Sequence, residues 1–405
     1  MSIYDAKDTV DATLALDGGP KVRTTPLPVR KLFGQAERDA VVSLMDRAMS
    51  EGSHALGYGG PEEEAYCKLF AEQLGGGFAD GVNSGTNAVY VALAALDLEP
   101  GSEVVVPPIS DAGGAMPVAM LGCVPVAADS APGSFNTDAR QIEQVLTDRT
   151  AAILVAHIAG LPIDMAPVLE LARKHKLAVV EDCAQAHGAK YQGQALGTLG
   201  DTAAFSTMFG KHHASGGQGG LVFTRREDLY WSARRRADRG KPFGLEGQHQ
   251  NVVAALNCNM DELHAAIGRA NVAKLPGFVA QRRRIAHRIA EGCLGLAGVS
   301  IQTERAGDEA SYWFLLLKLD LARLSVDTAG FAEAVTAEGV GCAAGYPFFP
   351  ARMPWASERW PMPELPNARA AEASHCRIMI HEGWTDAEAD DTFAAIHKVA
   401  SAYGK

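Results

Sequence analysis

The sequence predicts an α/β protein in which a mostly parallel sheet is covered by helices on both faces. Short apolar runs typical of buried strands alternate with stretches of helical periodicity through the middle of the chain. The chain also has 405 residues, which is enough for two or three domains with large cores. The predicted strands lie at residues 103–107, 123–127, 151–157, 177–180 and 202–208.

The first segment of the chain has no helical or strand periodicity. Residues 1–11 are polar, and the later proline-spaced stretch TTPLPVRKL predicts extended backbone. We therefore expect residues 1–34 to form an arm that packs on another part of the protein.

Two helices are predicted after the arm. The first covers residues 35–49, where apolar side chains gather at Val41, Val42, Leu44, Met45 and Ala48. The second begins at Pro61, because proline is favoured at the first helical position and the acidic residues 62–64 complement the helix dipole.

Ser84-Gly85-Thr86 lies directly before a nearly all-apolar helix predicted at residues 87–98. Free backbone N–H groups and the positive end of the helix dipole make such a turn suitable for a phosphate. From these residues alone, an ordinary serine cap also explains the pattern.

Two residues of opposite charge follow two of the predicted strands. Asp182 comes after strand 177–180, and Lys211 comes after strand 202–208, just before a glycine-dense loop. Pyridoxal phosphate (PLP) chemistry uses such a pair: the lysine amine holds the cofactor covalently, and the carboxylate keeps the pyridine nitrogen protonated. Taken alone, the pair also fits two ordinary loop residues.

The motifs around this pair resemble those of a known family. EDCAQAHGA, LGTLGD, FS followed five residues later by Lys211, and GGQGG before a strand are similar to the DegT/DnrJ/StrS sugar aminotransferases. The resemblance covers nearly the whole chain. It implies fold type I of the PLP-dependent enzymes, with a seven-stranded sheet in the large domain, and a homodimer with shared active sites.

The same resemblance implies the roles of individual residues. Lys211 and Asp182 are expected to be catalytic and also to bind the cofactor. The other expected cofactor-binding residues are Ser84, Gly85, Thr86, Gln185, Ser206 and Asn257. Asn257 matches the family asparagine that reaches the cofactor phosphate of the partner subunit, whereas Asn259 stands where arginine is usual.

Three residues are expected near the substrate: Asp111, His212 and Tyr346. Asp111 replaces the aromatic residue that usually stacks on the cofactor ring, and it is expected either to contact substrate hydroxyls or to cap the following helix. His212 and His213 are adjacent and lack the spacing of a zinc site, so no metal is expected. Some dehydratases of the family carry histidine at the position where this chain has Lys211. The lysine here therefore favours amino transfer.

The best domain boundary is Pro276-Gly277. Beyond it, a helix at 281–291, a strand at 313–319, a helix at 328–338 and a last helix with a capping box predict a smaller α+β domain. We therefore expect an arm at 1–34, a large PLP-binding domain at 35–275 and a small C-terminal domain at 276–405.

Composition excludes several classes of partner. The net charge of −11 disfavours binding to nucleic acid or to an anionic membrane. Seven cysteines without a CxxC pair indicate reduced thiols, and no signal peptide or long apolar run is present, so a cytoplasmic protein is expected.

The function expected from these features is transfer of an amino group from glutamate or glutamine to a nucleotide-linked keto-sugar or a cyclitol ketone. Dehydration of a sugar by PLP chemistry and a non-catalytic regulatory role are the alternatives. The basic stretch at residues 225–241 fits either a solvated helix face or an anchor for a nucleotide diphosphate.

Overall fold

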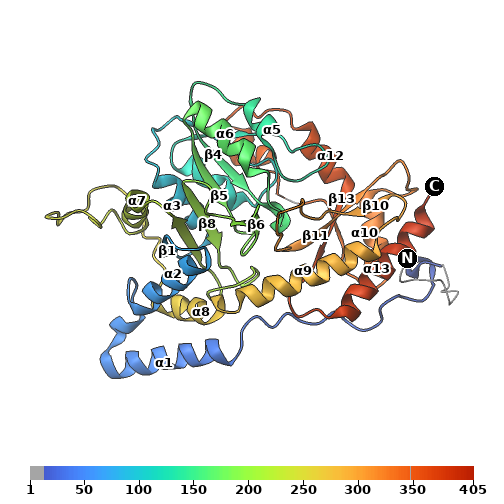
Figure 1. Ribbon diagram of the computed structural model, residues 1–405, viewed down its shortest axis with the longest axis horizontal. Helices are drawn as coiled ribbons and strands as arrows, with labels where there is room; N and C mark the ends of the chain where they lie inside the picture. Colours follow the sequence, from blue (N-terminus) through green and yellow to red (C-terminus); the bar gives the residue numbers. More distant parts are fainter. Residues whose placement is uncertain (1–12, 347) are drawn as a thin grey trace.

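The computed structural model describes residues 13–346 and 348–405. The described chain contains a seven-stranded sheet flanked by helices and, beside it, a four-stranded antiparallel sheet (Figure 1). Residues 1–12 of the predicted arm and Pro347 lie outside the described residues.

The seven-stranded sheet has the order β1-β9-β8-β5-β4-β2-β3. Only β9 runs antiparallel to its neighbours, β1 and β8, so the prediction of a mostly parallel sheet is confirmed. Its strands are β1 (Phe78–Val82), β2 (Glu103–Val106), β3 (Val124–Ala127), β4 (Thr150–Ala156), β5 (Ala178–Asp182), β8 (Thr202–Ser206) and β9 (Gly220–Thr224).

Helices cover both faces of this sheet because alternate strand residues point to opposite sides. Val104 and Val106 pack in a core with α3 (Gly85–Ala94), whereas Val105 packs in a second core with α2 (Pro61–Gln73) and α6 (Met165–His175). The helices of this part are α1 (Gln35–Glu51), α2 (Pro61–Gln73), α3 (Gly85–Ala94), α4 (Met116–Met120), α5 (Ala139–Glu143), α6 (Met165–His175), α7 (Glu227–Ala237) and α8 (Glu262–Val272). Two very short strands, β6 (Lys190–Tyr191) and β7 (Gln194–Ala195), pair beside the sheet.

The five strands predicted at residues 103–107, 123–127, 151–157, 177–180 and 202–208 each match an observed strand to within a few residues, but β1 was not predicted. Its sequence FADGV contains Asp80 and Gly81, residues that are depleted in strands, so it lacks an apolar run. The strand pairs with β9, and its buried Asp80 is compensated by Arg234 of α7, with Asp80 Oδ1 3.2 Å from Arg234 Nε.

The second sheet has the order β10-β11-β13-β12. Its strands are β10 (Val299–Ile301), β11 (Phe314–Leu319), β12 (Ala343–Ala344) and β13 (His375–Met379), and its helices are α9 (Leu275–Gly292), α10 (Thr328–Ala337), α11 (Pro354–Ser357), α12 (Pro366–Ser374) and α13 (Asp386–Tyr403). The capping box predicted for the last helix is present at Thr385 and Glu388. The predicted boundary at Pro276 falls in the first turn of α9, and the division into three parts stays a prediction.

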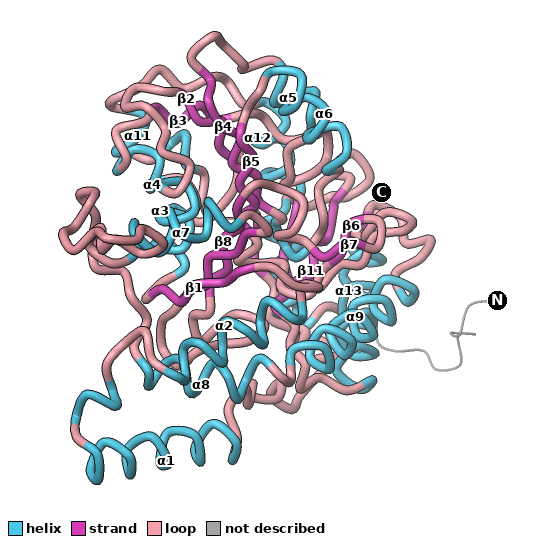
Figure 2. The backbone as a smooth tube through the Cα atoms, turned by 60° about the vertical axis from the view of Figure 1, so that its left-hand side comes forward, coloured by secondary structure: helices cyan, strands magenta, loops and turns pink. Residues whose placement is uncertain are grey.

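Helix α1 extends away from the sheet and packs on α8 (Figure 2). Among its predicted apolar positions only Leu44 is buried, while Val42 and Met45 are exposed. The described part of the arm runs as extended backbone with one 3-10 turn, and it is anchored to α13 by Arg23, which pairs with Glu388 and Asp391.

Candidate active site

Asp182 and Lys211 are brought together at the carboxyl edge of the seven-stranded sheet. Asp182 is the last residue of β5, and Lys211 follows β8, the neighbouring parallel strand. Both side chains are buried, and their charges interact. Ligand sites of open α/β sheets gather at this edge, so the pair occupies the expected position.

Burial and charge act in opposite directions on the Lys211 amine. Burial lowers the pKa of Lys211 to about 8, although the carboxylates of Asp182 and Asp111 favour the charged form. Burial also raises the pKa of Asp182. The hydrogen bond from the backbone N–H of Ala184 and the charge of Lys211 lower this pKa and offset part of the shift. A pKa of about 8 leaves an appreciable fraction of the amine neutral, and therefore nucleophilic, near neutral pH.

Ser84 caps α3 at the same edge of the sheet. Its Oγ accepts the backbone N–H of Asn87 at 3.1 Å, as the cap interpretation predicts. A Cβ at Gly85 would lie 2.5 Å from the Cβ of Ser206, so only glycine allows the start of α3 to approach the end of β8. The predicted residues Ser84, Gly85 and Ser206 are thus brought together.

The loop after β2 (Glu103–Val106) packs closely on this site through two glycines. A Cβ at Gly113 would lie 2.2 Å from Thr86 Oγ1, and one at Gly114 would lie 2.9 Å from Asp182 Oδ2. Asp111 is exposed and accepts the N–H of Gly113 at 2.9 Å, which caps the 3-10 turn Ala112–Gly114. The capping role of Asp111 is therefore observed, and a contact with substrate stays a prediction.

Gln185 and Tyr346 are bonded to each other. Gln185 Nε2 donates to the Tyr346 hydroxyl at 3.0 Å, and Gln185 Oε1 accepts the N–H of Ala159 at 2.9 Å. Burial, with the nearby charge of Asp111, raises the pKa of Tyr346. Tyr346 therefore lies near the acidic side of the site as a neutral phenol, fixed by Gln185.

His212 lies in a buried histidine cluster and not at an exposed surface. Its Nε2 is 3.2 Å from the carbonyl oxygen of Ser311, and its ring stacks on His187. His187 is in turn bonded to His213, whose Nε2 is 2.8 Å from the Tyr66 hydroxyl. Burial keeps the pKa of His212 well below its usual value, so the ring is neutral.

Asn257 is exposed beside the Ser84 turn of its own chain. The following residue, Cys258, accepts the N–H of Asn83 at 2.9 Å, and Asn257 Oδ1 accepts from the Asn259 amide at 2.7 Å. Asn259, which stands in place of the usual arginine, thus orients Asn257.

Trp313 was not predicted as a site residue. The Lys211 amine lies over its ring, 3.6 Å from the ring centroid, and its indole N–H donates to the carbonyl oxygen of Gly210 at 3.0 Å. In the sequence Trp313 only opens a predicted strand, and no spacing links it to Lys211. The contact arises because the second sheet lies beside the end of β8 (Thr202–Ser206).

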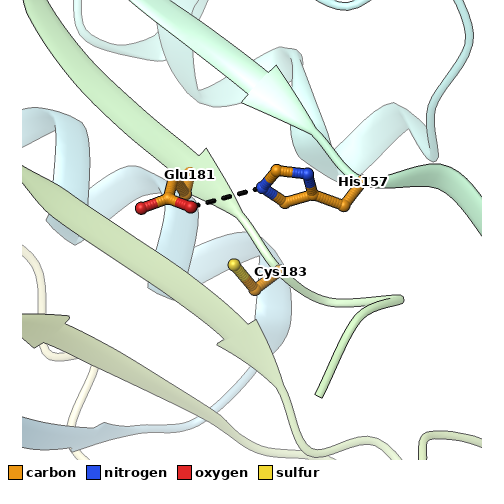
Figure 3. Close-up of side chains that lie close together, drawn as sticks. All are labelled: His157, Glu181 and Cys183. Atoms are coloured by element: carbon orange, nitrogen blue, oxygen red, sulfur yellow. Dashed lines mark hydrogen bonds and ion pairs between the residues drawn. The ribbon is translucent and has the colours of Figure 1, made fainter. Parts of the chain in front are cut away.

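In the described part of the chain, one group of potential metal ligands lies together: His157, Glu181 and Cys183 (Figure 3). The Glu181 carboxylate pairs with His157 at 3.3 Å and accepts three backbone N–H groups, from Gly197, Leu199 and Gly200.

These contacts occupy the metal-binding atoms of His157 and Glu181. His157 Nδ1 accepts the N–H of Ile163, so the ring proton is on Nε2 and is donated to Glu181. Burial opposes ionisation of Glu181, but the hydrogen bonds from His157 and the backbone lower the pKa of its carboxyl group. Burial also raises the pKa of the Cys183 thiol, which therefore stays protonated. The cluster therefore joins the ends of β4 (Thr150–Ala156) and β5 (Ala178–Asp182) and stabilises the sheet edge.

The basic stretch is largely neutralised by internal contacts. Arg234 pairs with Asp80, Arg236 with Asp97, and both Arg239 and Lys241 pair with Asp238. These contacts favour the interpretation of a solvated face with structural ion pairs.

Comparison with known proteins decides the family. The model of the DegT/DnrJ/EryC1/StrS aminotransferase family matches residues 42–397. The chain belongs to this family. The resemblance in the motifs is thereby confirmed, and so are the aminotransferase class and the fold expected from it.

Two relatives and one solved structure illustrate the match. GDP-perosamine synthase of Caulobacter vibrioides is 37% identical over 251 residues, which are 62% of this chain and 65% of that protein. L-glutamine:scyllo-inosose aminotransferase of Streptomyces griseus is 31% identical over 343 residues, 81% of this chain and 80% of that protein. The X-ray structure of the aminotransferase from Psychrobacter cryohalolentis has a TM-score of 0.84 at 29% identity, covering 94% of this chain and 99% of that one.

Proposed function

We propose that this aminotransferase uses PLP to move an amino group from glutamate or glutamine to a ketone of a sugar or a cyclitol. The observation that carries the proposal is the buried pair of Lys211 and Asp182 at the carboxyl ends of neighbouring strands, with the lysine pKa lowered to about 8.

The residues present fit this cofactor. Asp182 would hold the pyridine nitrogen, and Lys211 would hold the aldehyde carbon. The phosphate would be bound by the backbone N–H groups of Gly85 and Thr86 at the start of α3, together with Ser84 and Ser206. The close approach of Gly85 to Ser206 supports a shared phosphate site, because the missing side chain lets the start of α3 and the Ser206 hydroxyl lie side by side. When bound, the cofactor supplies an electron sink for the carbanion formed at the amino-bearing carbon.

The chain's own residues then hold charge and move the proton. Asp182 would keep a positive charge on the ring nitrogen, and Lys211, as the only titratable amine in direct reach of Asp182 in the described site, would carry the proton to and from the reacting carbon. Trp313 forms a wall beneath the lysine amine and limits its movement. His212 lies buried against the Ser311 carbonyl and the His187 ring, and its direct contact with a substrate stays a prediction.

The acceptor class rests on the relatives. They include GDP-perosamine synthase and L-glutamine:scyllo-inosose aminotransferase, and we propose a polyhydroxy six-membered ring with one ketone as the acceptor for this chain. The exposed carboxylate of Asp111 would accept a hydrogen bond from a hydroxyl of such a ring, a charged bond worth roughly 1.5–3 kcal/mol. The basic residues 234–241 are mostly engaged in ion pairs with acidic residues of the same chain, so they are less available to bind a nucleotide diphosphate. This favours a cyclitol over a nucleotide-linked sugar as the acceptor.

Assembly and location are also proposals. Asn257 is exposed, so a second subunit can reach its side chain, and this supports a homodimer in which each subunit completes its partner's site. All seven cysteines are free thiols, which supports a reducing compartment such as the cytoplasm. Among the described residues, no helix combines the length and apolarity needed to cross a membrane.

The test has two steps. Borohydride should fix PLP to the wild-type protein and not to Lys211→Ala, with peptide mass spectrometry placing the adduct on Lys211. Protein loaded with pyridoxamine phosphate should then convert it to PLP when a sugar or cyclitol ketone is added. Conversion by 2-oxo acids alone would overturn the acceptor class, and adduct formation in Lys211→Ala would overturn the role of the lysine.

A further inference from the structure

The N-terminal arm reaches the lysine loop through one side chain. Arg30 Nη2 donates to the carbonyl oxygens of Lys211 at 2.7 Å and His212 at 3.3 Å. Its Nε pairs with Glu382 Oε1 at 2.8 Å, and the two side chains are only 18% and 7% exposed. These bonds therefore form where water competes poorly, which makes charge-assisted bonds strong.

The other oxygen of Glu382 holds a second arginine. Arg282, on α9, lies 2.9 Å from Glu382 Oε2 and is almost fully buried. Its Nη1 donates to the carbonyl oxygens of Tyr312 at 3.1 Å and Trp313 at 3.3 Å. One carboxylate thus orients two guanidinium groups, one bonded to the backbone of Lys211 and the other to the backbone of Trp313.

The backbone held by Arg282 is unusual. Tyr312 has φ 47°, a left-handed conformation that is rare for an aromatic residue, and Ala159, whose carbonyl oxygen accepts the N–H of Trp313, has φ 63°. Such conformations persist where surrounding contacts over-determine them, and they cluster at functional sites. The Arg30–Glu382–Arg282 clamp supplies those contacts beside the lysine.

We propose that Arg30 is a positioning residue: the N-terminal arm, through the Arg30–Glu382–Arg282 clamp, fixes the Lys211 loop against Trp313 in its reactive geometry. The proposal rests on the proposed role of Lys211. Because Arg30 bonds to carbonyl oxygens and not to the amine, we expect it to fix the direction of the side chain. A misplacement of about 1 Å is enough to lower a rate substantially.

The chain offers a matched control in Arg23. It lies on the same arm, pairs with two acidic residues and is more buried than Arg30, but its partners Glu388 and Asp391 belong to α13. We therefore compare Arg30→Ala with Arg23→Ala. Arg30→Lys is the conservative variant, because one ammonium keeps the pair with Glu382 but cannot also span two carbonyl groups.

Both alanine variants should lower the urea midpoint of unfolding, since each breaks a buried ion pair. Only Arg30→Ala should increase the hydrogen exchange of residues 209–213 in cofactor-free protein. In protein with bound PLP, only this variant should weaken the visible circular dichroism of the cofactor. It should also lower kcat by about tenfold or more, with a smaller change in KM for the amino donor. Arg30→Lys should be intermediate, and it carries the test if Arg30→Ala does not fold.

Equal exchange, dichroism and kcat in Arg30→Ala and Arg23→Ala would overturn the proposal, as would wild-type values in Arg30→Lys. The exchange measurement needs no cofactor, so it separates this inference from the proposed function. If borohydride fixed PLP equally to Lys211→Ala, the function would fail while the exchange result still decided whether the clamp orders the loop.

Discussion

The proposed chemistry depends on the amine of Lys211, and the titration of this amine can be observed without cofactor. Burial lowers its pKa to about 8, while Asp182 and Asp111 limit the shift by favouring the ammonium form. We expect the rate of amine labelling at Lys211 in cofactor-free protein to rise through about pH 8. Peptide mass spectrometry after labelling at several pH values measures this, with the exposed Lys176 as the internal standard.

Asp182→Asn should shift the same labelling curve to lower pH. The substitution removes the carboxylate charge that favours the ammonium form and leaves burial in place. The same variant should fold with a near-native urea midpoint and lose nearly all turnover, because a neutral amide cannot hold a charged ring nitrogen. A labelling curve that moved to higher pH would contradict this assignment of charges.

Glu63 gives a prediction about stability. Burial and the charge of Asp80 raise the pKa of Glu63 to about 8, although its carboxylate accepts the N–H of Gly59 at 2.7 Å. Between its ordinary pKa of 4.5 and about 8, folded protein holds a proton that unfolded protein releases. The contribution of this group to stability is therefore full below about pH 4.5 and is lost as the pH rises towards 8.

Urea unfolding at pH 5 and pH 8 checks the sign. Buried histidines with a lowered pKa, such as His187, His212 and His213, raise the stability of both proteins over this range, so the sign is taken from the difference between wild type and variant. Glu63→Gln should gain stability relative to the wild type from pH 5 to pH 8, because its side chain no longer titrates. Glu64→Gln, an exposed neighbour on the same helix, should follow the wild type. If the free energy of unfolding rose from pH 5 to pH 8 in the wild type, and rose less in Glu63→Gln, the pKa shift of Glu63 would have the opposite sign.

At the scale of single elements, the start of α3 combines a structural cap with a proposed phosphate site. Ser84→Ala should cost about 1 kcal/mol of unfolding free energy by removing the cap, and it should also weaken PLP binding. Asp327→Ala is the matched control, since Asp327 caps α10 by accepting the N–H of Gly330 at 2.8 Å.

The control variant should lose a similar amount of stability and keep wild-type affinity for PLP. Urea unfolding without cofactor and fluorescence titration with PLP separate the two effects. Equal PLP affinity in both variants would leave Ser84 as a cap only.

At the scale of the whole molecule, the proposed dimer can be tested by mixing subunits. Lys211→Ala and Asn257→Ala proteins should each be nearly inactive as homodimers. If Asn257 serves the partner's site, a mixed dimer contains one site with both Lys211 and a neighbouring Asn257. Random mixing after unfolding and refolding should then restore about a quarter of wild-type activity, since half of the dimers are mixed and each has one complete site.

No recovery in that mixture would mean that Asn257 acts within its own chain. Co-refolding of Lys211→Ala with Asp182→Asn gives the control, because both residues belong to one site of one chain. That pair should show no recovery in either case.

The sequence alone was sufficient for the fold class, most strands, and the pair of Asp182 and Lys211. Buried parallel strands need continuous apolar runs, and α/β sheets carry their polar site residues just after those runs, so both signals are local. The capping box at Thr385 and the cap at Ser84 were also readable, because a cap depends on a few consecutive residues.

Only the tertiary structure could show what surrounds that pair. Strand β1 (Phe78–Val82) forms around a buried ion pair between Asp80 and a residue far along the chain, which no local pattern indicates. Trp313 and Arg30 meet the lysine loop through contacts that span more than a hundred residues of sequence. Burial sets the pKa of Lys211 and hides His212, and burial depends on how distant segments pack. The sequence by itself determined which chemical groups are present, and the packing of remote segments decided their geometry and their protonation.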